Sequence, residues 1–134
     1  METIESPLLE IKASGESIYT FLSDCNNHKL LMPEGIESFA ATTDTCSYSI
    51  KGTGNLALKV EERTPNSQIK LLPTGKVPFS FEFFWLIESN GENCKVQNKI
   101  IAKMNPFIKA LAQKPLQNFI TEQALNLQKY YHNK

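Results

Sequence analysis

Few residues in this sequence have the types and spacing that acid–base or metal chemistry needs. The two histidines, His28 and His132, lie far apart, and no residue at metal-ligand spacing accompanies them. Asp24 lies in an asparagine-rich loop, where such residues usually accept hydrogen bonds from backbone N–H groups. Glu82 has the parity of an outward-facing strand residue, and we expect His28 to be an exposed loop residue. The sequence therefore predicts no catalytic residue and no metal site.

Two polar residues fall among apolar ones on strand faces that we expect to point inward. Asn98 and Tyr48 are poor bases near neutral pH, but either could hydrogen-bond a ligand carbonyl or hydroxyl. For Tyr48 we favour a core phenol that reaches a backbone carbonyl. For Asn98 three interpretations stay open: a ligand contact, a locally satisfied buried amide, and a strand bulge that turns it outward.

The stretch KVPFSFEFFWLIE, residues 76–88, reads as a strand with a row of rings on one face. Phe79, Phe81, Phe83 and Trp85 share one parity, and successive strand side chains point to opposite faces. A packed hydrophobic core and the lining of a ligand cavity both account for this row.

Charge and cysteine usage exclude several classes of protein. Lysine plus arginine equals aspartate plus glutamate, 14 against 14, without a clustered basic block, which argues against a nucleic-acid partner. The cysteines Cys25, Cys46 and Cys94 are odd in number and far apart, so we expect buried free thiols rather than disulfides. The N-terminus lacks a signal-peptide pattern and no apolar run is long enough to span a membrane, so a cytoplasmic location is expected.

The elements that must position these residues follow from hydrophobic periodicity. Leu9 and Ile11 alternate with charged residues in a short first strand, and Pro7 fits a strand start or an outer strand. An amphipathic helix capped by Ser14 ends near Asn26, and a short helical turn over 28–32 follows. Six strands are then predicted, over 36–43, 46–51, 55–63, 67–72, 76–88 and 93–104, with Asn90-Gly91 as a two-residue hairpin turn.

The rest of the chain, after Asn105, predicts one long helix. Asn105 can cap it and Pro106 suits its first position. Pro115 should kink rather than break it, because it removes only one hydrogen bond. The apolar stripe expected to face the sheet comprises Phe107, Ile108, Leu111, Leu116, Phe119, Ile120, Leu127 and Tyr131.

Together these elements predict a single α+β domain over residues 1–134. Its order is β-α-α-β6-α: a curved antiparallel sheet of about seven strands that wraps around a long C-terminal helix, a helix-grip fold. A strongly curved sheet does not follow a straight helix closely, so we expect a pocket at one end of the interface.

The element order, together with LSDCNNHKLLMP at 22–33, IKGTGNLALKV at 50–60 and MNPFIKALAQKPLQNF at 104–119, resembles the SRPBCC or START-like superfamily. More narrowly, the chain is similar to small single-domain bacterial members that are often labelled polyketide cyclase-like. The resemblance implies a cavity under the terminal helix that binds a hydrophobic small molecule such as a lipid, a polyketide or a quinone.

The leading functional hypothesis is therefore binding or transport of an apolar small molecule such as a lipid, a polyketide or an aromatic metabolite, without a cofactor. A cyclase-, dehydratase- or hydrolase-like enzyme and a non-catalytic, chaperone- or quinone-related interaction protein stay open as alternatives. No residue pattern indicates an oligomeric state. The predicted ligand-binding residues are Tyr48, Phe81, Phe83, Trp85, Asn98, Ile100, Met104, Phe107 and Leu111.

Overall fold

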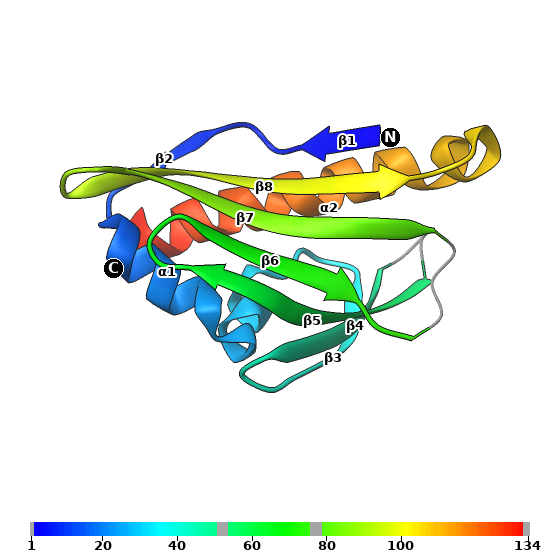
Figure 1. Cartoon of the computed structure of the whole chain (residues 1–134), viewed down its shortest axis with the longest axis horizontal. Coiled ribbons are helices and arrows are strands. Elements are labelled where there is room, and N and C mark those ends of the chain that lie inside the picture. The colour runs from blue at the N-terminus through cyan, green and yellow to red at the C-terminus, as the bar shows by residue number, and fades with distance from the viewer. Residues whose placement is uncertain (1, 51–53, 76–78, 133–134) are drawn as a thin grey trace.

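The computed structural model shown in Figure 1 describes residues 2–50, 54–75 and 79–132 of the chain. The predicted strand residues 51 and 76–78 lie outside this part. The elements are β1 (Glu2–Glu5), β2 (Leu9–Ile11), α1 (Gly15–Ser23), the 3-10 helix η1 (Cys25–Leu31), β3 (Ile36–Ala41), β4 (Thr45–Ile50), β5 (Gly54–Thr64), β6 (Gln68–Pro73), β7 (Ser80–Asn90), β8 (Asn93–Lys103) and α2 (Pro106–His132).

All strands belong to one antiparallel sheet, as predicted. The strand order is β1-β8-β7-β6-β5-β4-β3, and β2 also pairs with β8. The predicted first strand forms as β2, whereas β1, which pairs with the same strand β8, was missed. Ser6, Pro7 and Leu8 separate β1 from β2, and Ser6 N–H donates to Asn98 O at 2.9 Å, which keeps the chain attached to β8 across the break.

The first helix forms as predicted but ends earlier than Asn26. Ser14 Oγ caps α1 by accepting the Ser17 N–H at 3.1 Å. Asp24 has extended backbone angles (φ −99°, ψ 109°), so α1 ends at Ser23. The Asp24 carboxylate then accepts the Asn26 N–H at 3.0 Å and caps η1. Asp24 therefore has the backbone-satisfying role that its loop position indicated.

The hairpin between β7 and β8 lies one residue further along than predicted. Asn90 pairs with Asn93, so Gly91 and Glu92 form the two-residue turn rather than Asn90 and Gly91. Gly91 carries the positive φ, 65°, at the first central position. A glycine adopts this conformation without steric cost, which is why the turn is centred on it.

The long helix α2 runs without a break through Pro115, with Asn105 Oδ1 accepting the Ile108 N–H at 2.8 Å as its cap. A bend at Pro115 stays a prediction. The buried stripe of α2 comprises Ala112, Leu116, Phe119, Ile120, Gln123, Ala124 and Leu127. Two residues predicted to face the sheet do not: Phe107 is 71% exposed and Leu111 58% exposed. The first turns of α2 extend past the end of β8, so none of the described strands covers them (Figure 1).

The core fills the space between the inner face of the sheet and α2, which lie on top of one another in Figure 1. Phe81, Phe83, Trp85 and Ile87 on β7 are all buried, which confirms the predicted inward face of this strand. The α2 backbone packs closest to β1, β2, β8 and η1. The inward rings of β7 fill the wider gap beneath the middle of the sheet.

The last strand of the sheet, β3, is irregular. Its pairing with β4 changes register between Glu37 and Ala40. Ser38 has a φ of 57° within this stretch. A non-glycine residue rarely adopts the left-handed region, and here it accompanies a β-bulge.

None of the helices in the described part of the chain has the length and apolar character needed to cross a membrane.

Gly15 brings the start of α1 close to Ser89 on β7. A Cβ at this position would overlap Ser89 Oγ on β7 and lie 3.2 Å from Ser89 Cβ. We expect Gly15→Ala to lower the free energy of unfolding by about 1–3 kcal/mol, because overpacking outweighs the better helix propensity of alanine. Urea denaturation measures this effect. Ser89→Gly itself should cost about 0.5–1 kcal/mol, because glycine weakens a strand. In the Ser89→Gly background the Gly15→Ala change should therefore cost much less than in the parent, and a Gly15→Ala protein as stable as the parent would contradict the packing argument.

Candidate functional site

A cleft of about 380 Å³ opens between α2 and the segment that joins η1 to β3. Its lining comprises Pro33, Glu34, Gly35, Ile36, Ile50, Lys114, Pro115, Asn118, Phe119 and Glu122. The floor is apolar and continuous with the core, since Ile50 is only 5% exposed and Phe119 only 3%. Glu34, Lys114 and Glu122 place charges of both signs around the apolar floor.

The cleft forms where the sheet and α2 diverge. Asn126 Nδ2 donates to Leu31 O at 2.9 Å and holds the end of η1 against α2. Beyond this contact the chain turns away at Gly35, which has a φ of 90°, and enters β3. Because α2 packs closest to the other end of the sheet, at β1, β2 and β8, a space remains between Pro115 and the β3–β4 end. This agrees with the pocket expected at one end of a curved sheet.

Tyr48 lies directly behind the floor of the cleft. Its ring centroid is 5.4 Å from that of Phe119, and it stacks on Phe39 at 6.0 Å with an interplanar angle of 9°. Burial raises the pKa of the Tyr48 phenol well above its ordinary value, so the hydroxyl stays protonated at neutral pH. Tyr48 thus supports Phe119 and does not line this cleft.

A buried polar pair joins the sheet to α2 in the middle of the core. Asn98 Nδ2 donates to Gln123 Oε1 at 2.8 Å, and the Asn98 backbone N–H donates to Ser6 Oγ at 2.9 Å. Asn98 Oδ1 and the neighbouring Trp85 Nε1 are buried, and no described residue forms a hydrogen bond with either atom. Asn98 and Trp85 are paired residues of β8 and β7, so an unpaired acceptor and an unpaired donor come from adjacent strand positions.

The sequence-predicted ligand residues fall into three groups in the structure. Tyr48, Phe81, Phe83, Trp85, Asn98 and Ile100 are buried in the core. Met104 is partly buried beside it. Phe107 and Leu111 lie on the outer surface of α2. None of the nine lines the cleft, and their contact with a ligand stays a prediction.

The candidate acid–base residues have other partners. Glu82 Oε2 accepts from Lys70 Nζ at 2.7 Å in an ion pair that Glu61 shares, so the outward parity predicted for Glu82 is correct. The expectation that His28 is an exposed loop residue is wrong, because its ring is buried against Trp85 at a centroid distance of 6.4 Å. The His28 Nε2–H donates to Leu22 O at 2.8 Å. Desolvation lowers the pKa of His28, which therefore stays neutral.

Sequence reasoning missed the residues that build the cleft. Pro33, Glu34 and Gly35 fall between the predicted helical turn over 28–32 and the strand predicted from residue 36, and the apolar stripe predicted for the long helix omits Lys114, Asn118 and Glu122. A signal was present in the cluster Pro33-Glu34-Gly35, since such turns commonly border binding sites. The partner face on α2 could not be assigned, because it lies about eighty residues further along the chain.

Comparisons with known proteins identify the fold. No family model matches the chain, and no curated protein does. Among solved structures, a START superfamily protein from Mycobacterium smegmatis superposes with a TM-score of 0.69 at 19% identity, covering 98% of this chain and 97% of its own. The Aha1 dimer from Colwellia psychrerythraea gives a TM-score of 0.63 at 20% identity, covering 96% of this chain and 97% of the other.

A third structure extends the comparison to a biosynthetic protein. The di-domain ARO/CYC BexL from the BE-7585A biosynthetic pathway superposes with a TM-score of 0.73 at 13% identity, covering 99% of this chain and 47% of its own. At these low identities the likenesses show the fold alone. The chain has the SRPBCC or START-like, helix-grip fold that its sequence predicted.

Proposed function

We propose that this protein binds a hydrophobic small molecule, such as a lipid, a polyketide or an aromatic metabolite, between the curved sheet and α2. The observation that carries the proposal is the cleft of about 380 Å³ beside Pro115, which lies within the size range of small-molecule sites. Its apolar floor, formed by Ile50 and Phe119, would contact the apolar part of the ligand. The charged residues around it would contact a polar end.

The buried polar atoms beneath α2 give further support. Among the residues that the structure describes, Trp85 Nε1 is an unpaired donor and Asn98 Oδ1 an unpaired acceptor in a core that is otherwise almost wholly apolar. A buried polar group without a partner costs about 1–3 kcal/mol. A ligand hydroxyl that reached this pair could both donate and accept. The proposal places this binding in the cytoplasm, in keeping with the odd number of well-separated cysteines.

An enzyme that acts on such a ligand is the second candidate. Glu34 and Glu122 favour it, because they supply carboxylates at the cleft itself. Carboxylates can transfer protons to or from a bound substrate. Glu34→Gln and Glu122→Gln should leave affinity for an apolar ligand nearly unchanged if the protein is a carrier, and should abolish turnover of that ligand if it is an enzyme.

Filling the cleft tests the binding proposal. Asn118 is exposed on α2 and lines the cleft, so Asn118→Trp should occupy the space over Phe119 without disturbing the core. We expect this variant to bind the apolar dye Nile red at least about tenfold more weakly, a loss of about 1.4 kcal/mol. Fluorescence titration measures the affinity. Native mass spectrometry of the same samples should show co-purified apolar molecules on the parent protein and fewer on the variant.

Gln113→Trp is the matched control, because Gln113 is exposed on the same helix but does not line the cleft. Both tryptophan variants should unfold within about 0.5 kcal/mol of the parent, as surface substitutions usually do. Equal Nile red affinity in parent, control and Asn118→Trp would show that this cleft is not the binding site.

A further inference from the structure

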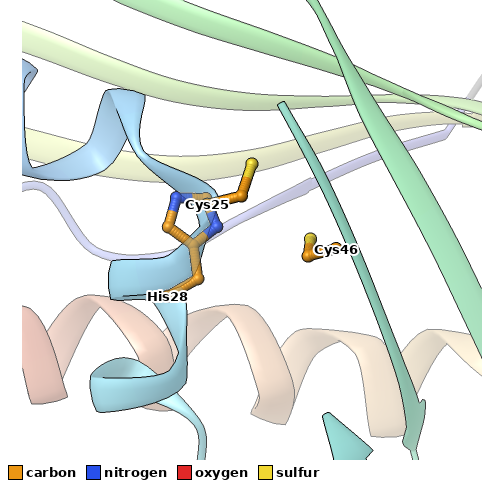
Figure 2. Close-up of side chains that lie close together, drawn as sticks. All are labelled: Cys25, His28 and Cys46. Carbon is orange, nitrogen blue, oxygen red and sulfur yellow. The ribbon is translucent and has the colours of Figure 1, made fainter. Parts of the chain in front are cut away.

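Three metal-ligating side chains from two elements meet inside the core. Cys25 opens η1, His28 follows one turn later, and Cys46 lies on the inward face of β4. The two sulfur atoms and a ring nitrogen of His28 all lie within 4.8 Å of one another, and all three residues are buried. Figure 2 shows the three side chains converging between η1 and β4. The sequence-based expectation that nothing at ligand spacing accompanies His28 is therefore wrong.

The main chain and Arg63 hold the two cysteine-bearing segments in place. The Cys25 N–H donates to Thr43 O at 3.0 Å, in the turn that leads into β4. The Arg63 guanidinium donates through Nη2 to Ser23 O at 2.8 Å and to Asp44 Oδ1 at 2.8 Å. Arg63 thereby ties the end of α1 to the β3–β4 turn. These contacts fix the separation of Cys25 and Cys46 without using either sulfur atom.

The orientation of His28 suits a metal ligand. Because Nε2 carries the proton that is donated to Leu22 O, the neutral ring keeps its lone pair on Nδ1. Figure 2 shows one ring nitrogen on the side of the cysteines and the other directed away from them. A histidine that binds a metal through one nitrogen usually donates its other N–H to a carbonyl or carboxylate in this way. Burial, by lowering the pKa of His28, also keeps the ring unprotonated.

The two thiols face the same point in the core. Their sulfur atoms and a ring nitrogen of His28 all lie within 4.8 Å of one another. A cation placed between the sulfur atoms would displace both thiol protons, because a cysteine binds a metal as the thiolate.

We propose that Cys25, His28 and Cys46 form a buried binding site for a thiophilic closed-shell metal ion, Zn²⁺ or Cu⁺. Thiolates and imidazole are the donor types that these ions take. Cu⁺ accepts three ligands, and Zn²⁺ with two cysteines and one histidine would take a water as its fourth ligand. With bonds of about 2.3 Å to sulfur and 2.0–2.1 Å to nitrogen, the ligand atoms of such a site lie about 3.5–4 Å apart. The separation observed here, at most 4.8 Å, requires the ligands to close in by about 1.3 Å or less.

Charge distinguishes the two ions. Zn²⁺ with two thiolates and a neutral imidazole has no net charge, which suits a buried position. Cu⁺ leaves one negative charge, which the Arg63 guanidinium can offset, and three ligands satisfy its preference for low coordination. In both cases the ion crosslinks η1 to β4. Binding should therefore raise the thermal midpoint of unfolding, and Zn²⁺ should release about two protons from the thiols.

The test uses the full chain, reduced and stripped of metal by a chelator. Zn²⁺ is titrated in competition with pyridylazo-resorcinol, and Cu⁺ in competition with bicinchoninate under anaerobic conditions. We expect one equivalent of at least one ion to bind, with a raised melting temperature that the chelator reverses. X-ray absorption at the edge of the bound metal should show two sulfur neighbours and one nitrogen from an imidazole.

Variants assign the ligands. Cys25→Ser and Cys46→Ser should each weaken the affinity at least about tenfold, because even loss of a supporting group outside a ligand set costs about 10–100-fold. Cys94→Ser is the control, since Cys94 is buried on β8 outside the cluster. If a serine variant fails to fold, the X-ray absorption spectrum of the metal bound to the parent protein identifies the ligand atoms instead. Binding of neither ion at one equivalent, a spectrum without sulfur neighbours, or equal loss in Cys94→Ser would overturn the proposal.

Discussion

Replacing Trp85 with alanine is expected to lower the free energy of unfolding by about 3–5 kcal/mol. Trp85 is fully buried, pairs with Ile69 and Asn98 on the two neighbouring strands, and fills the gap between the middle of the sheet and α2. Its removal leaves a large cavity that the surrounding strands cannot close. Urea denaturation monitored by circular dichroism measures the loss, and a protein that no longer folds at room temperature would agree with the same argument.

Two further variants separate packing from hydrogen bonding at this position. Trp85→Phe should cost less than half as much as Trp85→Ala, because Trp85 Nε1 has no hydrogen-bond partner among the described residues, so the change breaks none of the hydrogen bonds seen there. Phe107→Ala removes a ring of similar kind from the exposed start of α2 and should change stability by about 0.5 kcal/mol or less. If Trp85→Phe lowered the free energy of unfolding as much as Trp85→Ala, the indole N–H would have to make a stabilising contact that the described residues do not show.

The Asn98–Gln123 pair should show strong coupling in a double-mutant cycle. Gln123→Leu removes the acceptor at 2.8 Å from Asn98 Nδ2, which then has only Ile120 O at 3.4 Å. Because a buried donor loses its partner, this change should cost about 1–3 kcal/mol, and Asn98→Leu should cost about the same. Replacing both residues with leucine removes donor and acceptor together and should cost clearly less than the sum.

The measurement is urea denaturation of the parent, the two single variants and the double variant. We expect an interaction energy of at least about 1 kcal/mol, within the range found for contacting residues. Gln117→Leu serves as a control on the same helix, because Gln117 is less buried and bonds to Glu5 O and Thr121 instead. Strict additivity of the Asn98 and Gln123 effects would show that the amide pair does not join the sheet to α2.

The strands were predictable because their alternation is simple. From Phe81 to Ile87 on β7 every second residue is apolar and buried, and on β8 every second residue is buried and, except for Asn98, apolar. Turn residues separate the strands, so element order and inward faces followed directly. The segment β1 was missed because it has four residues and only Ile4 is buried. A strand that short has too few residues to establish a period.

The helix α2 was predictable in extent and, for Leu116, Phe119, Ile120 and Leu127, in its buried face, but not in its first turns. Its buried stripe passes through Ala112 and Gln123, whereas the sequence favoured Leu111 because leucine is more apolar than alanine. Stepping back from Leu127 by threes and fours reaches Gln123, Ile120, Leu116 and Ala112, so the phase was present in the spacing. Hydrophobicity alone concealed it, because a buried amide paired across the interface looks like a surface residue.

The cleft and the Cys25–His28–Cys46 cluster depend on tertiary structure. The spacing Cys25-x-x-His28 places both side chains on one turn of η1 and was the available signal. This spacing indicates a three-residue cluster only together with Cys46, which the β3–β4 hairpin brings to the same point. No local sequence pattern predicts the approach of Cys46, because it depends on how the hairpin folds back over η1.

The bulge in β3 has a consequence for the behaviour of the protein at high concentration. An outermost strand presents free N–H and C=O groups that can recruit a strand from another copy and start aggregation. On β3 the register change and the left-handed Ser38 interrupt that template, and on the opposite border Pro7 separates β1 from β2. Both edges of the sheet are therefore unfavourable templates for pairing with another copy. The sheet is protected from edge-to-edge aggregation although it is open and not closed into a barrel.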